Sequence, residues 1–182
     1  MNYKELQISR SEQKWGAKTF KVYTLENLRN QIEFLCTNYK IPKSIICLGI
    51  RNGNEYDFFK DNKFTKDSEV FGIDINPMVG GVGYNCYCYD FSKLPSNYKE
   101  SFDLVYSNSL DHAEDLDKTL KEWYRISRDY ILISFQNKNV KTNIVDIHNF
   151  DLDKIKTLTE PYFRILKVWE YKDNIAVLFN KK

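Results

Sequence analysis

Short apolar segments alternate with amphipathic segments along most of this chain. Five segments have the pattern of strands in a largely buried sheet: residues 44–48, 69–73, 86–89, 101–106 and 130–135. Three segments repeat apolar side chains at helical spacing: residues 24–39, 55–60 and 115–127. Thr24 is the candidate N-cap of the first predicted helix, and Pro42 ends it.

Three other segments lack a clear period: residues 1–20, 76–85 and 136–149. The first carries isolated aromatic side chains, and the third is polar and ambiguous. Pro77 and three glycines make a full helix unfavourable in the second. Periodicity alone therefore assigns no regular element to these three segments.

The C-terminal part changes from alternation to a hairpin. We expect a short helix over residues 151–159, then strands over 164–171 and 174–179 joined at Lys172 and Asp173. Strands that alternate with helices predict a parallel sheet covered on both faces. The predicted fold is therefore α/β, a Rossmann-like three-layer sandwich whose mostly parallel seven-stranded sheet ends in a C-terminal antiparallel hairpin. Residues 1–182 form one domain, with residues 1–40 as an N-terminal helical extension.

Composition narrows the classes of function. The 182 residues carry a net charge of +2 and 42% are hydrophobic, which suits a globular domain with a sizeable core. Nucleic-acid binders usually carry a strong basic stripe, so the near-neutral charge argues against such a partner. No apolar run reaches the roughly 18 residues of a membrane span, and residues 1–10 lack the apolar region of a signal peptide. We expect a cytoplasmic protein.

The four cysteines are expected to be free thiols in a reducing compartment. Cys86 and Cys88 have the wrong spacing for a zinc knuckle, and no second pair of Cys or His residues complements them. Side chains two residues apart on a strand share a face. We therefore expect a buried strand face here and no metal site.

Glycines or acids follow three successive predicted strands, where an open parallel sheet binds its ligands. Gly49 and Gly53 bracket the first loop, and glycine lets a backbone approach a ligand closely. Asp74 ends the second strand, where a carboxylate can accept both hydroxyls of a ribose. Asp90 can accept from an adenine amine, and Phe91 can cover the ring.

Each feature also has a purely structural explanation. The glycine loop could be a tight turn, Asp74 a turn former before Pro77, and Asp90 a cap for residues 91–93. Their coincidence at three successive strand ends favours an adenosine-binding site.

Four motifs resemble, in order and spacing, those of the class I S-adenosylmethionine-dependent methyltransferase family. They are ICLGIRNG (46–53), VFGID (70–74), YDFSKLP (89–95) and SFDLVYSNSLDHA (101–113). The last is similar to the fourth-strand signature of the small-molecule branch, as is the Tyr-Arg-Ile of residues 124–126. The resemblance covers the chain from about Ile41 to its C-terminus.

The resemblance implies S-adenosyl-L-methionine as the cofactor. It implies that Asp74 holds the ribose, that Asp90 holds the adenine amine, and that the glycines line the methionine end. The expected cofactor-binding residues are Gly49, Arg51, Asn52, Gly53, Asp74, Ile75, Asp90, Phe91 and Asn108. Members of the family often cover their site with N-terminal elements, so residues 1–40 could act as a lid. Three aromatic residues either belong to that lid or pack on the sheet edge: Trp15, Phe20 and Tyr23.

The sequence departs from the family pattern at several positions. Cys47 stands where the family usually has an acid, two residues before the first glycine. Arg51 replaces the middle glycine, so its side chain either points away from the ligand or binds the methionine carboxylate, for which a guanidinium is well suited. Residues 127–129 replace a Pro-Gly-Gly turn.

Methyl transfer from a sulfonium depends mainly on positioning, and a general base is needed only for a hydroxyl or a protonated amine. His112 and Asp111 are the candidate catalytic residues. For His112 the alternative is packing against the cofactor or capping the following helix. His148 lies in the loop after the fifth strand, where acceptor-binding residues can reside.

Three functions remain open from the sequence. The first is a methyltransferase for a small molecule or a glycan precursor, since the core fold leaves little length for a substrate domain. The second is a nucleic-acid or protein methyltransferase. The third is a non-catalytic cofactor-binding domain or subunit, which the departures at Cys47 and Arg51 keep open. A nicotinamide oxidoreductase fits less well, because Gly-x-Gly-x-x-Gly is absent. The oligomeric state stays open.

Overall fold

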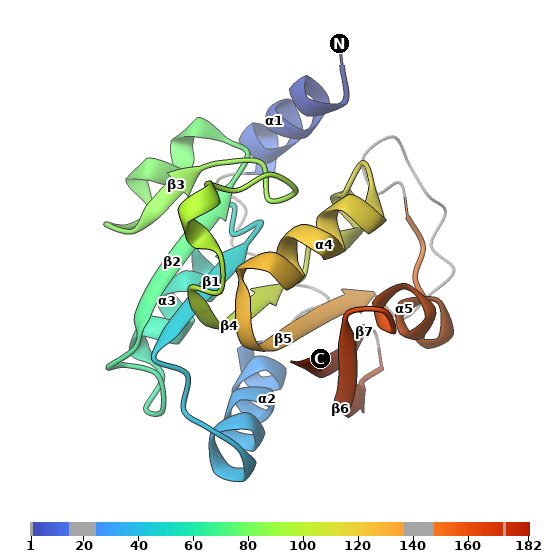
Figure 1. Ribbon diagram of the computed structural model, residues 1–182. Coiled ribbons are helices and arrows are strands. Elements are labelled where there is room, and N and C mark those ends of the chain that lie inside the picture. Colours follow the sequence, from blue (N-terminus) through green and yellow to red (C-terminus); the bar gives the residue numbers. More distant parts are fainter. Residues whose placement is uncertain (1, 15–24, 137–147, 173) are drawn as a thin grey trace.

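The computed structural model describes residues 2–14, 25–136, 148–172 and 174–182. Within these ranges seven strands form one sheet in the order β3-β2-β1-β4-β5-β7-β6 (Figure 1). The strands are β1 (Ser44–Leu48), β2 (Glu69–Asp74), β3 (Cys86–Cys88), β4 (Phe102–Ser107), β5 (Ser127–Gln136), β6 (Phe163–Glu170) and β7 (Asn174–Lys181). β1 to β5 are parallel, and β7 pairs antiparallel with both β5 and β6.

Helices cover both faces of the sheet (Figure 1). The helices of the described ranges are α1 (Tyr3–Lys14), α2 (Leu25–Asn38), α3 (Asn54–Asp61), α4 (Leu116–Ile126) and α5 (Leu152–Thr159). α2 and α3 pack on one face, and α4 and α5 pack on the other, each pair with its own buried apolar cluster. The three-layer α/β sandwich predicted from the sequence is therefore confirmed.

α4 shows how the sequence produces this arrangement. Leu120, Trp123 and Ile126 are fully buried and recur every three residues, so one stripe of the helix faces the sheet. The Asp115 side chain accepts from the backbone N–H of Lys118 and caps the first turn.

Several details of local structure differ from the expectations. Residues 3–14 form α1, in the segment expected to be an N-terminal helical extension, although no periodicity gave its bounds. β5 begins at Ser127 rather than Tyr130, because its first residue pairs with Phe102 of β4 across a bulge. Cys86 is buried but Cys88 is exposed, because β3 is the edge strand and has a neighbour on one side. The expected buried cysteine face is thus only half formed.

Other expectations fall on residues outside the described ranges. These are the candidate cap and the aromatic residues assigned to a lid or to the sheet edge: Trp15, Phe20, Tyr23 and Thr24.

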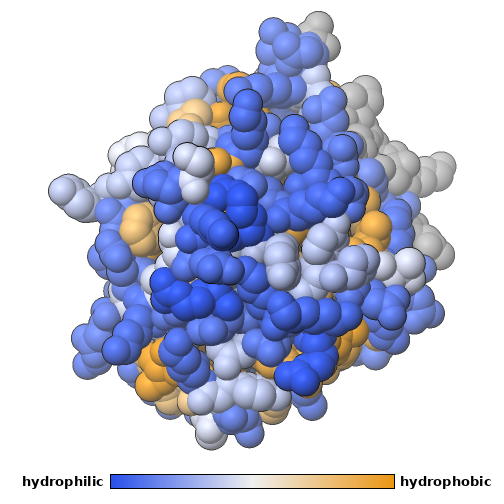
Figure 2. Space-filling model, viewed as in Figure 1, coloured by the Kyte–Doolittle hydropathy of each residue, from blue (hydrophilic) through white to orange (hydrophobic). Residues whose placement is uncertain are grey.

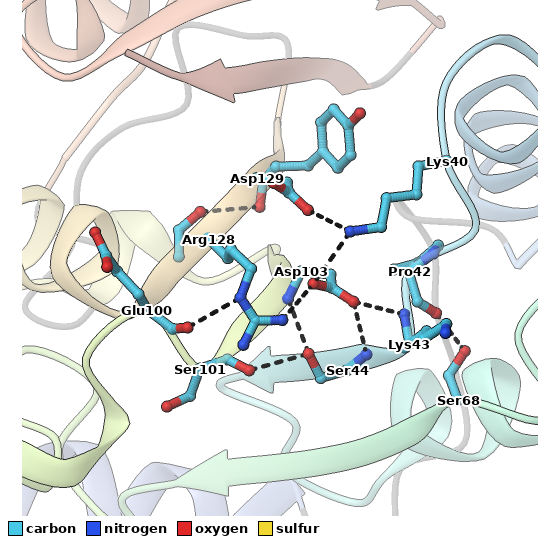
Figure 3. Close-up of polar contacts among 12 residues, drawn as sticks. Lys40, Pro42, Lys43, Ser44, Ser68, Glu100, Ser101, Asp103, Arg128 and Asp129 are labelled. Carbon is cyan, nitrogen blue, oxygen red and sulfur yellow. Dashed lines mark hydrogen bonds and ion pairs between the residues drawn. The ribbon is translucent and has the colours of Figure 1, made fainter.

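The amino-terminal ends of β1 and β4 are tied together by a polar network (Figure 3). Asp103, at the start of β4, is 1% exposed. Its Oδ1 accepts from the Arg128 guanidinium at 2.7 Å, and its Oδ2 accepts from the backbone N–H groups of Lys43 at 2.8 Å and Ser44 at 3.3 Å. The Lys40 ammonium lies 3.6 Å away. The negative charge of this carboxylate is therefore compensated by groups of the chain itself.

The face shown in Figure 2 is mainly hydrophilic, with hydrophobic residues in small separate patches. Among the described residues no helix has the length and apolar character needed to cross a bilayer.

Candidate functional site

A cleft opens at the carboxyl ends of β1 to β4. The sheet reverses its winding between β1 and β4, and ligands bind at such a switch point in open α/β sheets. The cleft encloses about 850 Å³, part of it open to solvent. It is lined by Tyr3, Lys4, Gln7, Ser11, Gly49, Arg51, Asp74, Ile75, Asp90, Phe91, Ser92, Ser109, His112, Ala113 and Glu114.

The loop after β1 forms one wall of the cleft. Gly49 has a φ of +80°, and a Cβ on it would lie 2.5 Å from the Ser109 hydroxyl. Glycine is therefore required here for both backbone conformation and space. Arg51 adopts a left-handed φ of 46° without being glycine, a conformation that costs energy for a side chain of this size. This unfavourable conformation lies in a loop that lines the cleft.

Asp74 forms the floor of the cleft at the end of β2. Its Oδ2 accepts from the backbone N–H of Arg51 at 2.8 Å, and its Oδ1 accepts from that of Asn76 at 2.9 Å. The side chain is largely buried, and burial raises the pKa of the carboxyl above its ordinary value. Each carboxylate oxygen can accept a second hydrogen bond. A ligand with two hydroxyl groups would supply these donors.

Asp90 and Phe91 follow the carboxyl end of β3. Oδ1 of Asp90 accepts from the backbone N–H and the hydroxyl of Ser92, at 2.8 and 2.7 Å. Asp90 thus makes hydrogen bonds within the segment it was expected to cap, and it also lines the cleft. Phe91 packs edge-on against Trp123 at 5.8 Å, and the Trp123 indole N–H donates to the Phe91 carbonyl at 3.1 Å. The aromatic wall is therefore anchored from behind.

A buried carboxyl lies behind the glycine loop. Glu55, in the first turn of α3, is 4% exposed, and burial raises its pKa to about 7. The Asn108 side-chain amide donates to Glu55 Oε1 at 2.7 Å. The same amide accepts from the Ser109 hydroxyl at 3.0 Å. A chain of hydrogen bonds thus runs from the cleft wall to the buried acid.

The loop after β4 brings His112 to the opposite rim. Its Nε2 lies 4.0 Å from Oδ1 of Asp111, and both side chains are partly exposed. The backbone carbonyl of His112 accepts from the Tyr3 hydroxyl at 2.8 Å. Nε2 of His148 lies 2.8 Å from the carbonyl of Ala113, and partial burial lowers the pKa of His148. His148 therefore supports the cleft wall from outside.

α1 lies across the mouth of this cleft. Four of its residues line the cleft: Tyr3, Lys4, Gln7 and Ser11. Gln7 is three or four positions from each of the others, so they share one face of the helix. The Tyr3 hydroxyl also accepts from the Gln7 amide at 2.6 Å. The helix is thus held to the rim by the hydrogen bond between Tyr3 and His112.

The structure brings most of the predicted site residues to the cleft wall: Gly49, Arg51, Asp74, Ile75, Asp90, Phe91 and His112. The remaining ones adjoin it in the same loops: Asn52, Gly53, Asn108 and Asp111. Gly53, with a φ of +86°, precedes α3. The chain thus gathers the predicted residues at one edge of the sheet.

Sequence reasoning missed two kinds of site residue. The first is Glu55, although it lies four residues before the buried Phe59 and therefore on the buried side of its helix. The second is the cleft-facing side of α1. The signal for this helix was Asn2 and Glu5, which exchange backbone-to-side-chain hydrogen bonds at 2.8 and 2.9 Å, the pattern of a capping box.

The residues at the cleft fit an adenosyl amino acid. Gly49 lines the cleft with backbone atoms, its missing Cβ making room for the Ser109 side chain, and Asp74 offers acceptors for vicinal hydroxyls. Phe91 offers an aromatic edge, and Arg51 offers a cation for a carboxylate. Among the described residues no group of three His, Cys, Asp or Glu side chains could hold a metal ion.

Part of the chain matches a known family. Residues 46–130 match the family model described as a methyltransferase domain. This segment runs from β1 into β5 and contains the cleft-lining loops after β1, β2, β3 and β4. No curated protein matches the chain.

Several solved structures have the same fold. A SAM-dependent methyltransferase from Aquifex aeolicus has 12% identity and a TM-score of 0.70, with 96% of this chain and 98% of that chain covered. The 1,6-didemethyltoxoflavin-N1-methyltransferase of Burkholderia thailandensis has 1,6-didemethyltoxoflavin and S-adenosylhomocysteine bound. It has 12% identity and a TM-score of 0.76, with 98% of this chain and 87% of that chain covered. The N-methyltransferase NodS of Bradyrhizobium japonicum, in complex with S-adenosylhomocysteine, has 10% identity and a TM-score of 0.70, with 96% and 98% covered.

At these identities the likeness shows the fold. Together with the matched domain, it supports the predicted class I methyltransferase family and S-adenosylmethionine as the cofactor. The small-molecule branch stays a prediction.

Proposed function

We propose that this chain is an S-adenosylmethionine-dependent methyltransferase that acts on a small molecule or a glycan precursor. The observation that carries the proposal is the cleft at the switch point, where Asp74 and Phe91 face the glycine loop. These residues offer a carboxylate for a ribose, an aromatic ring for a base and a glycine backbone in the cleft wall.

The proposed roles follow from the chemistry of each group. Asp74 accepts from the ribose hydroxyls, and Asp90 accepts from the adenine amine through the oxygen not used by Ser92. Ile75 and Phe91 enclose the adenine, and Arg51 binds the methionine carboxylate. When bound, the cofactor supplies an activated methyl group on a sulfonium. The chain itself orients the reactants and excludes water.

We assign the acceptor side of the cleft to α1 and the loop after β4. Tyr3, Lys4 and Glu114 line this side, where a compact acceptor would bind in this proposal. In this proposal residues 1–40 act as the predicted lid. The bound ligand of the Burkholderia thailandensis neighbour is also a small molecule, which favours this acceptor class.

His112, with Asp111 beside it, is the proposed general base for an acceptor that must lose a proton. With the acceptor in hand, His112→Gln should lower turnover by about 100-fold or more while S-adenosylhomocysteine affinity changes little. If turnover were unchanged, His112 would have only the packing role.

The test of the cofactor assignment is binding of S-adenosylhomocysteine, measured by calorimetry on wild type and Asp74→Ala. We expect binding to wild type and a loss of about 100-fold or more in the variant, because two ribose hydrogen bonds to a carboxylate are removed. Asp67→Ala, an exposed position before the same strand, is the control and should bind like wild type. Unchanged affinity in Asp74→Ala would contradict the proposal, as would binding of a nicotinamide cofactor instead.

One observation favours a second candidate, a cofactor-binding domain without transfer activity. Arg51 occupies a glycine position in a left-handed conformation, so the loop is not the usual open one. The test incubates wild-type protein with a cell extract and follows methylation by mass spectrometry. Binding of S-adenosylhomocysteine without methyl transfer to any compound of the extract would favour this candidate.

A further inference from the structure

Glu55 is a buried acid that the proposed roles leave unused. It lies at the start of α3, behind the glycine loop, and only 4% of it is exposed. The charged groups around it are Arg51 in the loop and Asp74 on β2, and the neutral Cys47 thiol on β1 is also nearby. Arg51 favours its ionised form, and Asp74 opposes it. A carboxyl is costly to ionise at such a depth unless a cation compensates it.

Asn108 connects Glu55 to the cleft. Because its Nδ2 donates to Glu55 at 2.7 Å, its Oδ1 is turned toward Ser109. The Ser109 hydroxyl lines the cleft and lies 3.4 Å from the carbonyl oxygen of Gly49. Oxygen atoms therefore gather where the loops after β1 and β4 meet. Acceptors backed by a carboxylate suit an ammonium group.

The charges at this corner match both ends of an amino acid. Arg51 places a cation on the cleft wall, and Glu55 places an acid behind the same loop, four residues along the chain. Cys47, in contrast, contributes no charge at the end of β1, since burial raises the pKa of its thiol far above neutrality. Glu55, through the Asn108 amide, can supply negative charge for an α-ammonium at this corner.

We propose that Glu55, acting through Asn108 and Ser109, recognises the α-ammonium group of the cofactor's amino-acid end. This inference rests on the proposed function. Glu55 is a positioning residue: it orients the Asn108 amide and supplies the negative charge behind it. An ammonium bound at Ser109 stabilises the carboxylate, so binding at neutral pH releases a proton from Glu55. Affinity for ligands with the ammonium should therefore rise as the pH rises toward and through about 7.

The experiment compares two ligands that differ at this end. S-adenosylhomocysteine carries the ammonium, and 5′-methylthioadenosine lacks the whole amino-acid part. We expect wild type to bind S-adenosylhomocysteine about tenfold more tightly at pH 7.5 than at pH 6, with proton release measured by calorimetry in buffers of different ionisation enthalpy. The affinity for 5′-methylthioadenosine should not change with pH.

Glu55→Gln tests the residue while keeping its shape and an acceptor for Asn108. The variant should lose the pH dependence and the proton release, and should bind S-adenosylhomocysteine about tenfold more weakly than wild type at pH 7.5, with 5′-methylthioadenosine unaffected. The control is Asp57→Asn, which removes an acid from the same first turn of α3 at an exposed position and should behave like wild type.

Equal weakening of both ligands in Glu55→Gln, or a pH profile identical to that of wild type, would overturn the inference. Such results leave the proposed function intact, because wild type still binds both ligands. Failure of wild type to bind either ligand would instead contradict the proposed function itself.

Discussion

The pKa values of the buried acids shift in opposite directions at the two ends of the parallel strands. At the amino-terminal ends, Asp103 has the Arg128 guanidinium, the Lys40 ammonium and two backbone N–H groups around it, and these donors hold its pKa below the ordinary value despite burial (Figure 3). At the carboxyl ends, burial dominates and raises the pKa of both Asp74 and Glu55. All three side chains are almost inaccessible to solvent.

The difference separates a buried acid that serves the fold from buried acids that could serve a ligand. Asp103 is compensated within the chain, so it contributes to stability and has no need of a ligand. Asp74 and Glu55 are undercompensated, a state that costs stability and persists where a ligand supplies the missing donors. Their location at the switch point is consistent with a ligand that brings hydroxyl and ammonium groups.

The largest expected effect is on the compensated side. Asp103→Ala leaves Arg128 and the N–H groups of Lys43 and Ser44 without their acceptor, and should lower the free energy of unfolding by about 3 kcal/mol. For a chain of this length the thermal midpoint should fall by roughly 6–12 °C. S-adenosylhomocysteine affinity of the folded variant should stay at the wild-type level. A loss of affinity as large as that of Asp74→Ala would break the comparison.

A smaller effect of opposite sign is expected for Glu55→Gln without ligand. Burial raises the pKa of Glu55 from its ordinary 4.5 to about 7 in the folded protein, so wild type loses stability as the pH rises from 4.5 through 7. The variant cannot ionise and should gain on the order of 2 kcal/mol relative to wild type at pH 8. At pH 5 the gain should be much smaller.

Denaturant unfolding at the two pH values provides this measurement. Asp103→Asn is the counterpart, since the low pKa of Asp103 gives stability that is present above the unfolded-state pKa and is lost as the pH falls through the folded-state value. If Glu55→Gln were less stable than wild type at pH 8, the carboxylate would be compensated and the comparison would fail.

The smallest effect concerns the two arginines. Arg51→Ala should weaken S-adenosylhomocysteine by about tenfold and leave 5′-methylthioadenosine unchanged, because only the former has a carboxylate to bind. Arg128→Ala should lower stability by about 1 kcal/mol, since the side chain is 51% exposed, and should not affect either ligand. Calorimetry with both ligands measures the affinities of each variant, and thermal unfolding measures their stability. Equal weakening of both ligands by Arg51→Ala would make that residue structural.

The sequence was sufficient for the sheet and for the acids at its strand ends. Buried strands such as β1 read as continuous apolar runs, and the position of Asp74 follows directly from where β2 ends. The bounds of α1 could not be predicted because its polar composition gives no stripe, and the helix is also held by a tertiary contact between Tyr3 and His112. The depth of Glu55 likewise depends on packing between α3 and the loop after β4, which no local pattern encodes.

The contact between Tyr3 and His112 also has a practical consequence. Any polypeptide joined ahead of Tyr3 emerges at the rim of the cleft, where it can obstruct entry or displace the helix from its hydrogen bond. Lys182, in contrast, is bonded to Glu160 and Tyr162, beside α5 and β6. Purification tags and reporter fusions therefore belong after Lys182, where they leave the cleft accessible.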